Sequence, residues 1–224
     1  TESRGKVVKL TLSAGVTHAD AGVNDKGQSL ERTTLTGTAE LSVEAKARLG
    51  KVGVDAKGFA GTENTYSATA PKGTDMSFAH PLDPESLPEG TSLRLSSAWY
   101  KGYELGGSYA AIVADMGSRS GTEHYVEITR GPGDEVTVRV GNDEFDKAAS
   151  SLGLGGDKAS VSLNADSALT NGKATEVTFD LSTKAGQDAY DQFVFGGKAP
   201  AAGDPGVVDV AKIEAFQGSK STGF

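Results

Sequence analysis

The feature that most constrains the fold is a strict alternation of residue types between Leu35 and Leu49. Every odd-numbered position in this stretch is apolar or small, and every even-numbered position is polar. Successive side chains of a β-strand point to opposite faces, so a sustained period of two predicts a strand. The stretch therefore predicts one long strand with an apolar face and a polar face.

The alternation continues beyond a short interruption. Gly50-Lys51 breaks the pattern, and the apolar positions then resume on even numbers from Val52 to Ala56. This change of phase is what a two-residue hairpin turn produces, because it places Leu49 opposite Val52 and Ala45 opposite Ala56. A glycine at the first turn position suits a type II′ turn. The sequence thus predicts a long amphipathic hairpin over residues 35–60.

Weaker alternation predicts further strands along the chain. They fall at residues 8–16, 91–105, 109–116, 125–130, 135–141, 159–165, 177–181 and 207–216. The total is about nine to eleven strands, with a bulge near Val210, where the apolar phase changes. The apolar residues on both sides of Gly131–Asp134 are even-numbered, which requires a hairpin loop of three or five residues.

The intervening segments predict loops and one helix. Residues 18–29 and 61–90 lack periodicity, and Gly106-Gly107 is typical of a turn. A helix is predicted near residues 183–195, because Ser182 or Thr183 can cap it and Gly196-Gly197 can end it. Its apolar positions are Ala185, Ala189 and Phe193.

These elements predict an all-β fold, an antiparallel sandwich or barrel built of long amphipathic hairpins with one short helix. A single β-rich domain over residues 1–224 is expected. The proline-containing segment 61–90 is interpreted either as a covering Ω-like excursion or as a boundary between sub-domains. The turn-like ends of the sequence predict a fragment of a larger protein.

Composition excludes several classes of protein. The chain has 22 Lys and Arg against 30 Asp and Glu, a net charge of −8. An acidic protein without a basic cluster is a poor ligand for phosphate backbones, so no nucleic-acid partner is expected. It contains no cysteine, which excludes disulfides and thiolate metal sites. No apolar run approaches the roughly 18 residues of a membrane helix, and no signal peptide is visible.

No group of residues indicates a catalytic or metal site. His18, His80 and His124 have no second histidine at a metal-ligand spacing. The acidic segment Asn142–Asp146 lacks the glycine and the closing glutamate of a calcium loop and is interpreted as an acidic turn. No G-x-S-x-G motif occurs. The sequence therefore predicts a protein that is not an enzyme, with no catalytic residue, no metal and no cofactor.

Trp99, Tyr100 and Tyr103 are the candidate partner-binding residues. Trp99 and Tyr103 share one face of the predicted strand, and Tyr100 takes the other. If one face is core, at least one of these rings is exposed to a sugar, a lipid headgroup or a protein. The alternative interpretation packs all three rings inside.

The length of the 35–49 strand leaves a membrane role open. A membrane-spanning strand needs only about 9–11 residues, and small apolar residues alternating with charges are typical of pore-forming hairpins. Aromatic girdles are absent, however, and a sheet in water with one wet face produces the same pattern. The soluble interpretation is preferred.

Several short motifs resemble a known class of protein. They are Leu87-Pro88-Glu89-Gly90, Gly106-Gly107, the alternating Val136, Val138 and Val140, and the segment from Asp180 to Phe193. Together they resemble β-rich, Gly-rich segments of very large secreted bacterial polymorphic toxins, upstream of the C-terminal toxin domain. The resemblance covers about residues 83–197.

The resemblance implies a non-catalytic module for delivery, encapsulation or membrane passage of a cargo toxin domain. It also implies a secreted or cell-surface bacterial location. The expected partners are other domains of the same polypeptide and, in the membrane-passage case, a bilayer. It assigns no functional residue. The alternative is a soluble binding or spacer domain for a protein or carbohydrate ligand, with no membrane role.

Overall fold

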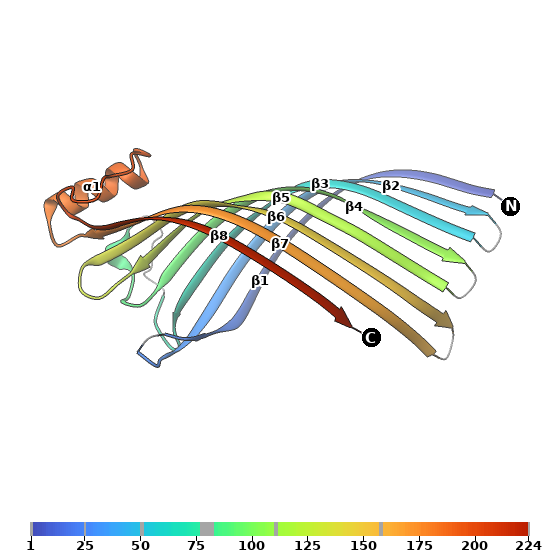
Figure 1. Ribbon diagram of the computed structural model, residues 1–224, viewed down its shortest axis with the longest axis horizontal. Coiled ribbons are helices and arrows are strands. Elements are labelled where there is room, and N and C mark those ends of the chain that lie inside the picture. The colour runs from blue at the N-terminus through green and yellow to red at the C-terminus, as the bar shows by residue number, and fades with distance from the viewer. Residues whose placement is uncertain are drawn as a thin grey trace.

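The computed structural model is a single antiparallel sheet in which the spatial order of the strands follows their order in the chain (Figure 1). It describes residues 2–24, 26–49, 52–76, 83–109, 112–156 and 159–223. The strands are β1 (Glu2–Val23), β2 (Ser29–Leu49), β3 (Val52–Pro71), β4 (Ser92–Tyr109), β5 (Ile112–Arg130), β6 (Glu135–Gly156), β7 (Ala159–Asp180) and β8 (Val207–Gly223). A 3₁₀ turn, η1 (Pro84–Ser86), precedes β4, and the helix α1 (Lys184–Val194) follows β7.

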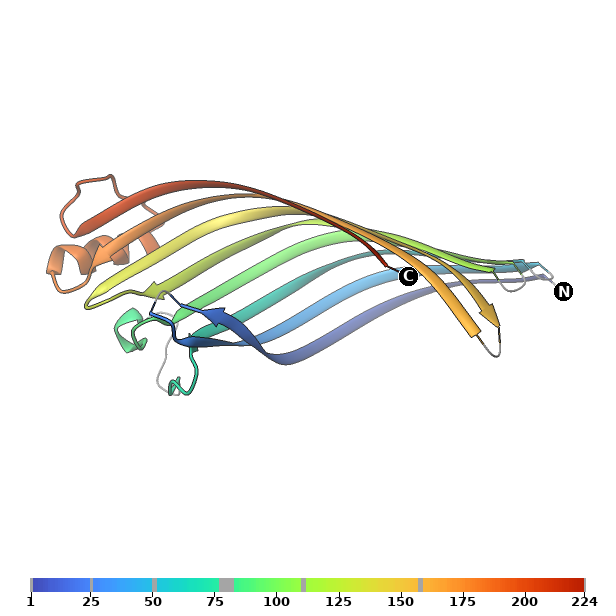
Figure 2. The same cartoon turned by 60° about the horizontal axis from the view of Figure 1, so that its bottom comes forward.

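The predicted all-β antiparallel architecture with one short helix is confirmed. The strands are longer and fewer than expected, since the sheet has eight and the longest contain 22 residues. At about 3.3 Å per residue such a strand extends roughly 70 Å. The strands form one curved layer (Figure 2). Among the described residues no ladder joins β1 to β8, so the sheet is open and is not closed into a barrel.

The register of the long hairpin is the predicted one. Leu49 pairs with Val52 and Ala45 pairs with Ala56 in the β2–β3 ladder. The predicted type II′ turn at Gly50-Lys51 lies outside the described residues. Alternation of apolar side chains is therefore sufficient to fix both strands and their pairing.

Three expected interruptions are wrong. β1 continues through residues 18–23, β3 continues through residues 61–71, and Gly106-Gly107 lies inside β4 rather than at a turn. In residues 18–23 the apolar positions change from even to odd numbers, and at Thr62 and Asn64 polar residues interrupt the apolar face of β3 before Tyr66 resumes it. Backbone hydrogen bonds to the neighbouring strands continue each strand through these changes in the sequence pattern.

The predicted spacing of the β5–β6 hairpin is confirmed, and the predicted bulge in the last strand is present at a nearby residue. Arg130 pairs with Val136, which leaves five residues between the last paired positions of the β5–β6 hairpin. In the β7–β8 ladder Thr178 pairs with Asp209 and Phe179 with Val207, so the bulged residue is Val208. The bulge lies two positions before the one expected.

The buried hydrophobic cluster of the described residues lies where α1 packs on the sheet, at the left end in Figure 1. Of the two predicted caps, Ser182 and Thr183, it is the Thr183 hydroxyl that caps α1, since it accepts a hydrogen bond of 3.0 Å from the Gly186 N–H. Phe179 of β7 packs against the rings of Tyr190 and Phe193, with centroids 5.8 and 5.9 Å away. The members of the cluster are Leu87, Leu93, Ile128, Val136, Val138, Val177, Phe179, Leu181, Tyr190 and Phe193.

Candidate functional site

The two faces of the sheet have different chemistry. We call one of them the apolar face: it carries the ladder row Leu10, Leu41 and Ala60 and, at its far end, Phe179 under α1. Most of this face beyond α1 is open to solvent. Its exposed large apolar side chains are Val8, Leu10, Leu12, Val16, Leu35, Leu41, Val43, Leu95, Trp99, Tyr103 and Val140. The opposite face, called the charged face, carries the ion pairs described below.

The structure separates the three aromatic residues singled out in the sequence. Trp99 and Tyr103 lie on the apolar face and are 54% and 48% exposed, while Tyr100 lies on the charged face and is 3% exposed. This is the division between faces that the alternation predicts. Two of the three rings are therefore accessible to a partner, and Tyr100 is covered by its neighbours.

A groove of about 730 Å³ crosses the apolar face next to the covered end. Its floor is one ladder row that runs across β2 to β6. The side chains of this row are Leu35, Tyr66, Leu95, Val126 and Val140. The groove falls within the size range of sites for small molecules, which are concave and mostly apolar.

A second hollow of about 440 Å³ adjoins the groove and shares His124, Val140 and Gly141 with it. This one is polar. Its other walls include Asn142, Thr175, Lys173, Lys212 and Glu214, from β6, β7 and β8. Neither lysine has an ion-pair partner within the part of the chain that the structure describes. No local pattern in the sequence points to this group, because the residues are far apart along the chain.

On the charged face, aromatic rings pack over glycines of neighbouring strands and so link those strands through side chains. Tyr100 pairs with Gly61, and Tyr125 pairs with Gly141. A Cβ on Gly61 would lie 2.8 Å from Cζ of Tyr100, and one on Gly141 would lie 2.8 Å from the Tyr125 hydroxyl oxygen. Only glycine leaves room for these rings. The same arrangement pairs Phe59 with Gly102 and Phe145 with Gly121.

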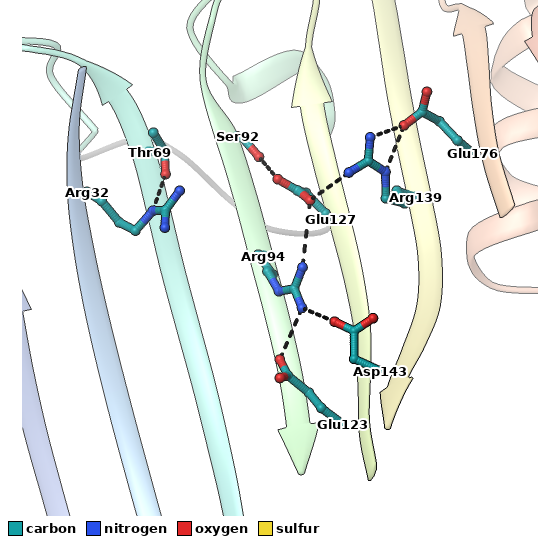
Figure 3. Close-up of polar contacts among 9 residues, drawn as sticks. All are labelled: Arg32, Thr69, Ser92, Arg94, Glu123, Glu127, Arg139, Asp143 and Glu176. Atoms are coloured by element: carbon teal, nitrogen blue, oxygen red, sulfur yellow. Dashed lines mark hydrogen bonds and ion pairs between the residues drawn. The ribbon is translucent and has the colours of Figure 1, made fainter. Parts of the chain in front are cut away.

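Ion pairs extend across the same face (Figure 3). Arg94 lies 3.2 Å from Glu123 and 3.5 Å from Asp143, and its guanidinium carbon is 3.7 Å from the ring centroid of Tyr125. Glu127 accepts a hydrogen bond of 2.9 Å from Ser92. These contacts join β4, β5 and β6 through side chains in addition to the backbone ladder.

The network continues from Glu127 to Arg139 at 3.9 Å, and the Arg139 Nε donates to Glu176 at 2.8 Å (Figure 3). Each carboxylate of this network faces an arginine. Burial, with the nearby charge of Asp143 adding to it, raises the pKa of Tyr125. The arrangement stabilises the sheet. Among the residues of this described network, no nucleophile lies beside a free general base.

The interpretation of Asn142–Asp146 as an acidic turn is wrong. The segment lies inside β6, where Asp143 points to the charged face and Glu144 to the apolar face. His18 hydrogen-bonds the Thr33 hydroxyl at 2.9 Å, and His80 lies outside the described residues. In the part of the chain that the structure covers, no three His, Asp or Glu side chains gather as metal ligands.

Sequence reasoning misses the ring–glycine pairs because it interprets glycines as turn residues. A signal is nevertheless present: Gly61, Gly121 and Gly141 each lie directly opposite an aromatic residue once the strands are in register. Glycine inside a strand commonly marks a close approach of another group. Recognising it requires the register, which the alternation does not specify for these strands.

Among the described residues no helix is long and apolar enough to cross a membrane. No protein-family model matches the sequence, and no curated protein shows significant similarity to it.

Proposed function

We propose that the chain is a non-catalytic module of a secreted multidomain bacterial toxin, and that its apolar face covers a cargo toxin domain during delivery. The observation that carries this proposal is the extent of exposed apolar side chain on one face, which runs from β1 to β6. Soluble proteins rarely leave a contiguous apolar patch larger than a few hundred Å² without a partner. The face therefore requires a covering surface in the complete protein.

The polar residues within the apolar face favour a polypeptide over lipid as that surface. Lys101 is exposed in the same ladder row as Leu41 and Ala60, and Asn64 and Ser97 lie nearby on the same face. A lysine at the middle of a bilayer costs about 2–4 kcal/mol. A folded cargo domain can offer hydrogen-bond and ion-pair partners to these groups, whereas acyl chains cannot.

In this proposal the apolar face contacts the cargo domain, and the charged face is the opposite side of the sheet, in contact with water. Its ion pairs and ring–glycine pairs hold a single layer of strands in shape without a second layer of protein. Arg119, for example, stacks on Tyr100 at 3.6 Å from the ring centroid and pairs with Glu63 at 3.2 Å. Membrane passage is the competing role, and it predicts a different response of the apolar face to lipid.

The test uses single cysteines carrying an environment-sensitive dye, one at Val43 on the apolar face and one at Glu44 on the charged face. These adjacent residues form a matched pair, and the chain has no native cysteine. Each labelled chain is measured alone, joined to the cargo toxin domain that the proposal requires, and mixed with anionic liposomes as the pH is lowered.

We expect the joined toxin domain to shift the Val43 emission to the blue and to leave Glu44 unchanged, with no response to liposomes. A blue shift at Val43 with liposomes alone would favour membrane insertion. Equal responses at both positions, or no response to the toxin domain, would overturn the proposal.

A further inference from the structure

We infer that the groove and the adjoining polar hollow together form a binding site for an anionic amphiphile, a long alkyl chain carrying a carboxylate or phosphate headgroup. The inference goes beyond the proposed function, because it concerns a small ligand bound by this chain in the absence of cargo. It rests on the continuity of an apolar and a basic compartment on one face of the sheet.

The groove supplies the compartment for the alkyl chain. Its floor from Leu35 through Leu95 to Val140 crosses five adjacent strands. With neighbouring strands about 4.8 Å apart, this row extends roughly 19 Å, which accommodates an extended long acyl chain. Leu95 is 37% exposed, so a ligand lying on the row removes apolar surface from water without moving the sheet.

The polar hollow supplies the compartment for the headgroup. Lys173 and Lys212 line it, together with Asn142 and one acidic residue, Glu214. The lining residues of the hollow thus carry two ammonium groups and one carboxylate, in a protein whose net charge is −8. An anionic headgroup can accept hydrogen bonds from the ammonium groups, and charge-assisted hydrogen bonds of this kind are the stronger ones in proteins.

The lysines of the hollow differ from other lysines of the chain. Lys57 pairs with Glu40 at 3.2 Å, and Lys184 pairs with Asp188 one helical turn away. Lys173 lies opposite Glu214 in the β7–β8 ladder, yet no ion pair joins them. Within the described residues, Lys173 and Lys212 are thus available to an external anion.

The two compartments meet at His124, Val140 and Gly141, which line both. A ligand with its headgroup between Lys173 and Lys212 therefore has its chain directed onto Val140 and the groove floor. His124 is exposed at this junction and can donate a further hydrogen bond to the headgroup. The geometry thus fixes the orientation of the ligand as well as its class.

The test measures the affinity of the isolated chain for three probes of equal chain length: palmitate, hexadecyl phosphate and hexadecanol. Displacement of a fluorescent fatty acid gives each affinity below the micelle concentration. We expect both anions to bind at least tenfold more tightly than the alcohol. The ratio of palmitate to hexadecyl phosphate identifies which headgroup the hollow prefers.

Two variants assign the compartments. The double variant Lys173→Met and Lys212→Met should weaken the anions about tenfold or more and leave hexadecanol unchanged. Leu95→Asn should weaken all three probes. Lys101→Met is the matched control, because Lys101 is exposed on the same face but lines neither hollow; its affinities should equal those of the unmodified chain.

The far-ultraviolet circular dichroism and the thermal midpoint of each variant establish that it is folded. Equal affinity for the alcohol and the anions, anion binding that survives loss of both lysines, or no saturable binding of any probe would each overturn the inference. None of these results depends on the cargo domain, so the proposed function and this inference fail separately.

Discussion

The covered and open parts of the apolar face differ in burial although one strand runs through both. Leu93 and Leu95 lie on the same face of β4, two residues apart, yet Leu93 is fully buried and Leu95 is 37% exposed. The difference is the second layer, because Leu93 belongs to the buried cluster formed with Leu87 and α1, whereas Leu95 lies outside it. Alternation places both leucines on one face, and only the overlying elements decide which becomes core.

In the open part, side-chain contacts on the charged face stabilise the sheet. Beyond α1 the apolar face has no covering layer among the described residues, while the charged face there carries ring–glycine pairs and ion pairs. A single layer of strands loses the usual contribution of packing two faces against each other. Cross-strand contacts between side chains on the charged face replace part of it.

The largest effect should come from comparing the two leucines directly. Leu93→Ala removes a fully buried side chain and should lower the free energy of unfolding by about 2–5 kcal/mol. Leu95→Ala should cost about 1 kcal/mol or less, because much of its surface is already in water. Urea unfolding monitored by circular dichroism measures both. Equal losses would mean that the open part is covered in solution, for instance by a second copy of the chain.

The next effect concerns Tyr190 in the covered part, whose hydroxyl has no hydrogen-bond partner within the described residues. Burial, with the charges of Asp191 and Asp83 adding to it, raises the pKa of Tyr190 to about 12 from 10.0. The folded chain thus keeps a proton that the unfolded chain loses between these values. The stabilisation is complete below pH 10 and is lost as the pH rises towards 12.

This loss amounts to at most about 2.7 kcal/mol. Tyr190→Phe should remove that part of the alkaline loss of stability and be neutral or stabilising at pH 7, where it removes an unpaired buried hydroxyl. Urea unfolding between pH 7 and 11 measures it. Tyr103→Phe is the control, because its ring is exposed on the open part. A pH dependence identical in wild type and Tyr190→Phe would contradict the prediction.

A smaller effect should come from comparing glycines on the charged face and on the apolar face, outside the region covered by α1. A Cβ on Gly121 would lie 2.2 Å from the Trp99 carbonyl oxygen and 2.8 Å from Cζ of Phe145, whereas one on Gly58 would meet nothing within 4 Å. Gly121→Ala should therefore destabilise by about 1–3 kcal/mol. Gly58→Ala should be neutral or stabilising by about 0.4–1 kcal/mol. Thermal midpoints of the two variants measure the contrast, and similar midpoints would show that the rings do not hold this region.

The smallest effect tests how firmly α1 closes the covered part. Thr183→Ala removes the cap that accepts from the Gly186 N–H and should cost about 1 kcal/mol. Thr183→Ser keeps the hydroxyl and should restore most of the loss. Hydrogen exchange of the Phe179 and Val177 amides measures the opening of this end. If exchange at Val43, on the open part, increased equally, the two regions would unfold as one unit.

Much of the fold is predictable because local chemistry specifies it. The 35–49 alternation, the Leu49–Val52 pairing and the Thr183 cap depend on neighbours close in the sequence, and all three predictions are confirmed. The strand segments at 18–23 and 61–71 escape prediction, because the apolar alternation changes phase or is interrupted there and only pairing with adjacent strands shows that the strands continue. The candidate site escapes it for the same reason, since Lys173 and Lys212 meet only across the β7–β8 ladder.

The sequence by itself determined which side chains share a face, because the direction of a side chain in a strand follows from its position along the backbone. That is why alternation alone separates Trp99 and Tyr103 from Tyr100. Only the tertiary structure decided which parts of a face are buried. Burial depends on a second layer arriving from elsewhere in the chain: α1 covers Phe179, and the buried cluster that contains Leu93 and Leu87 does not include Leu95.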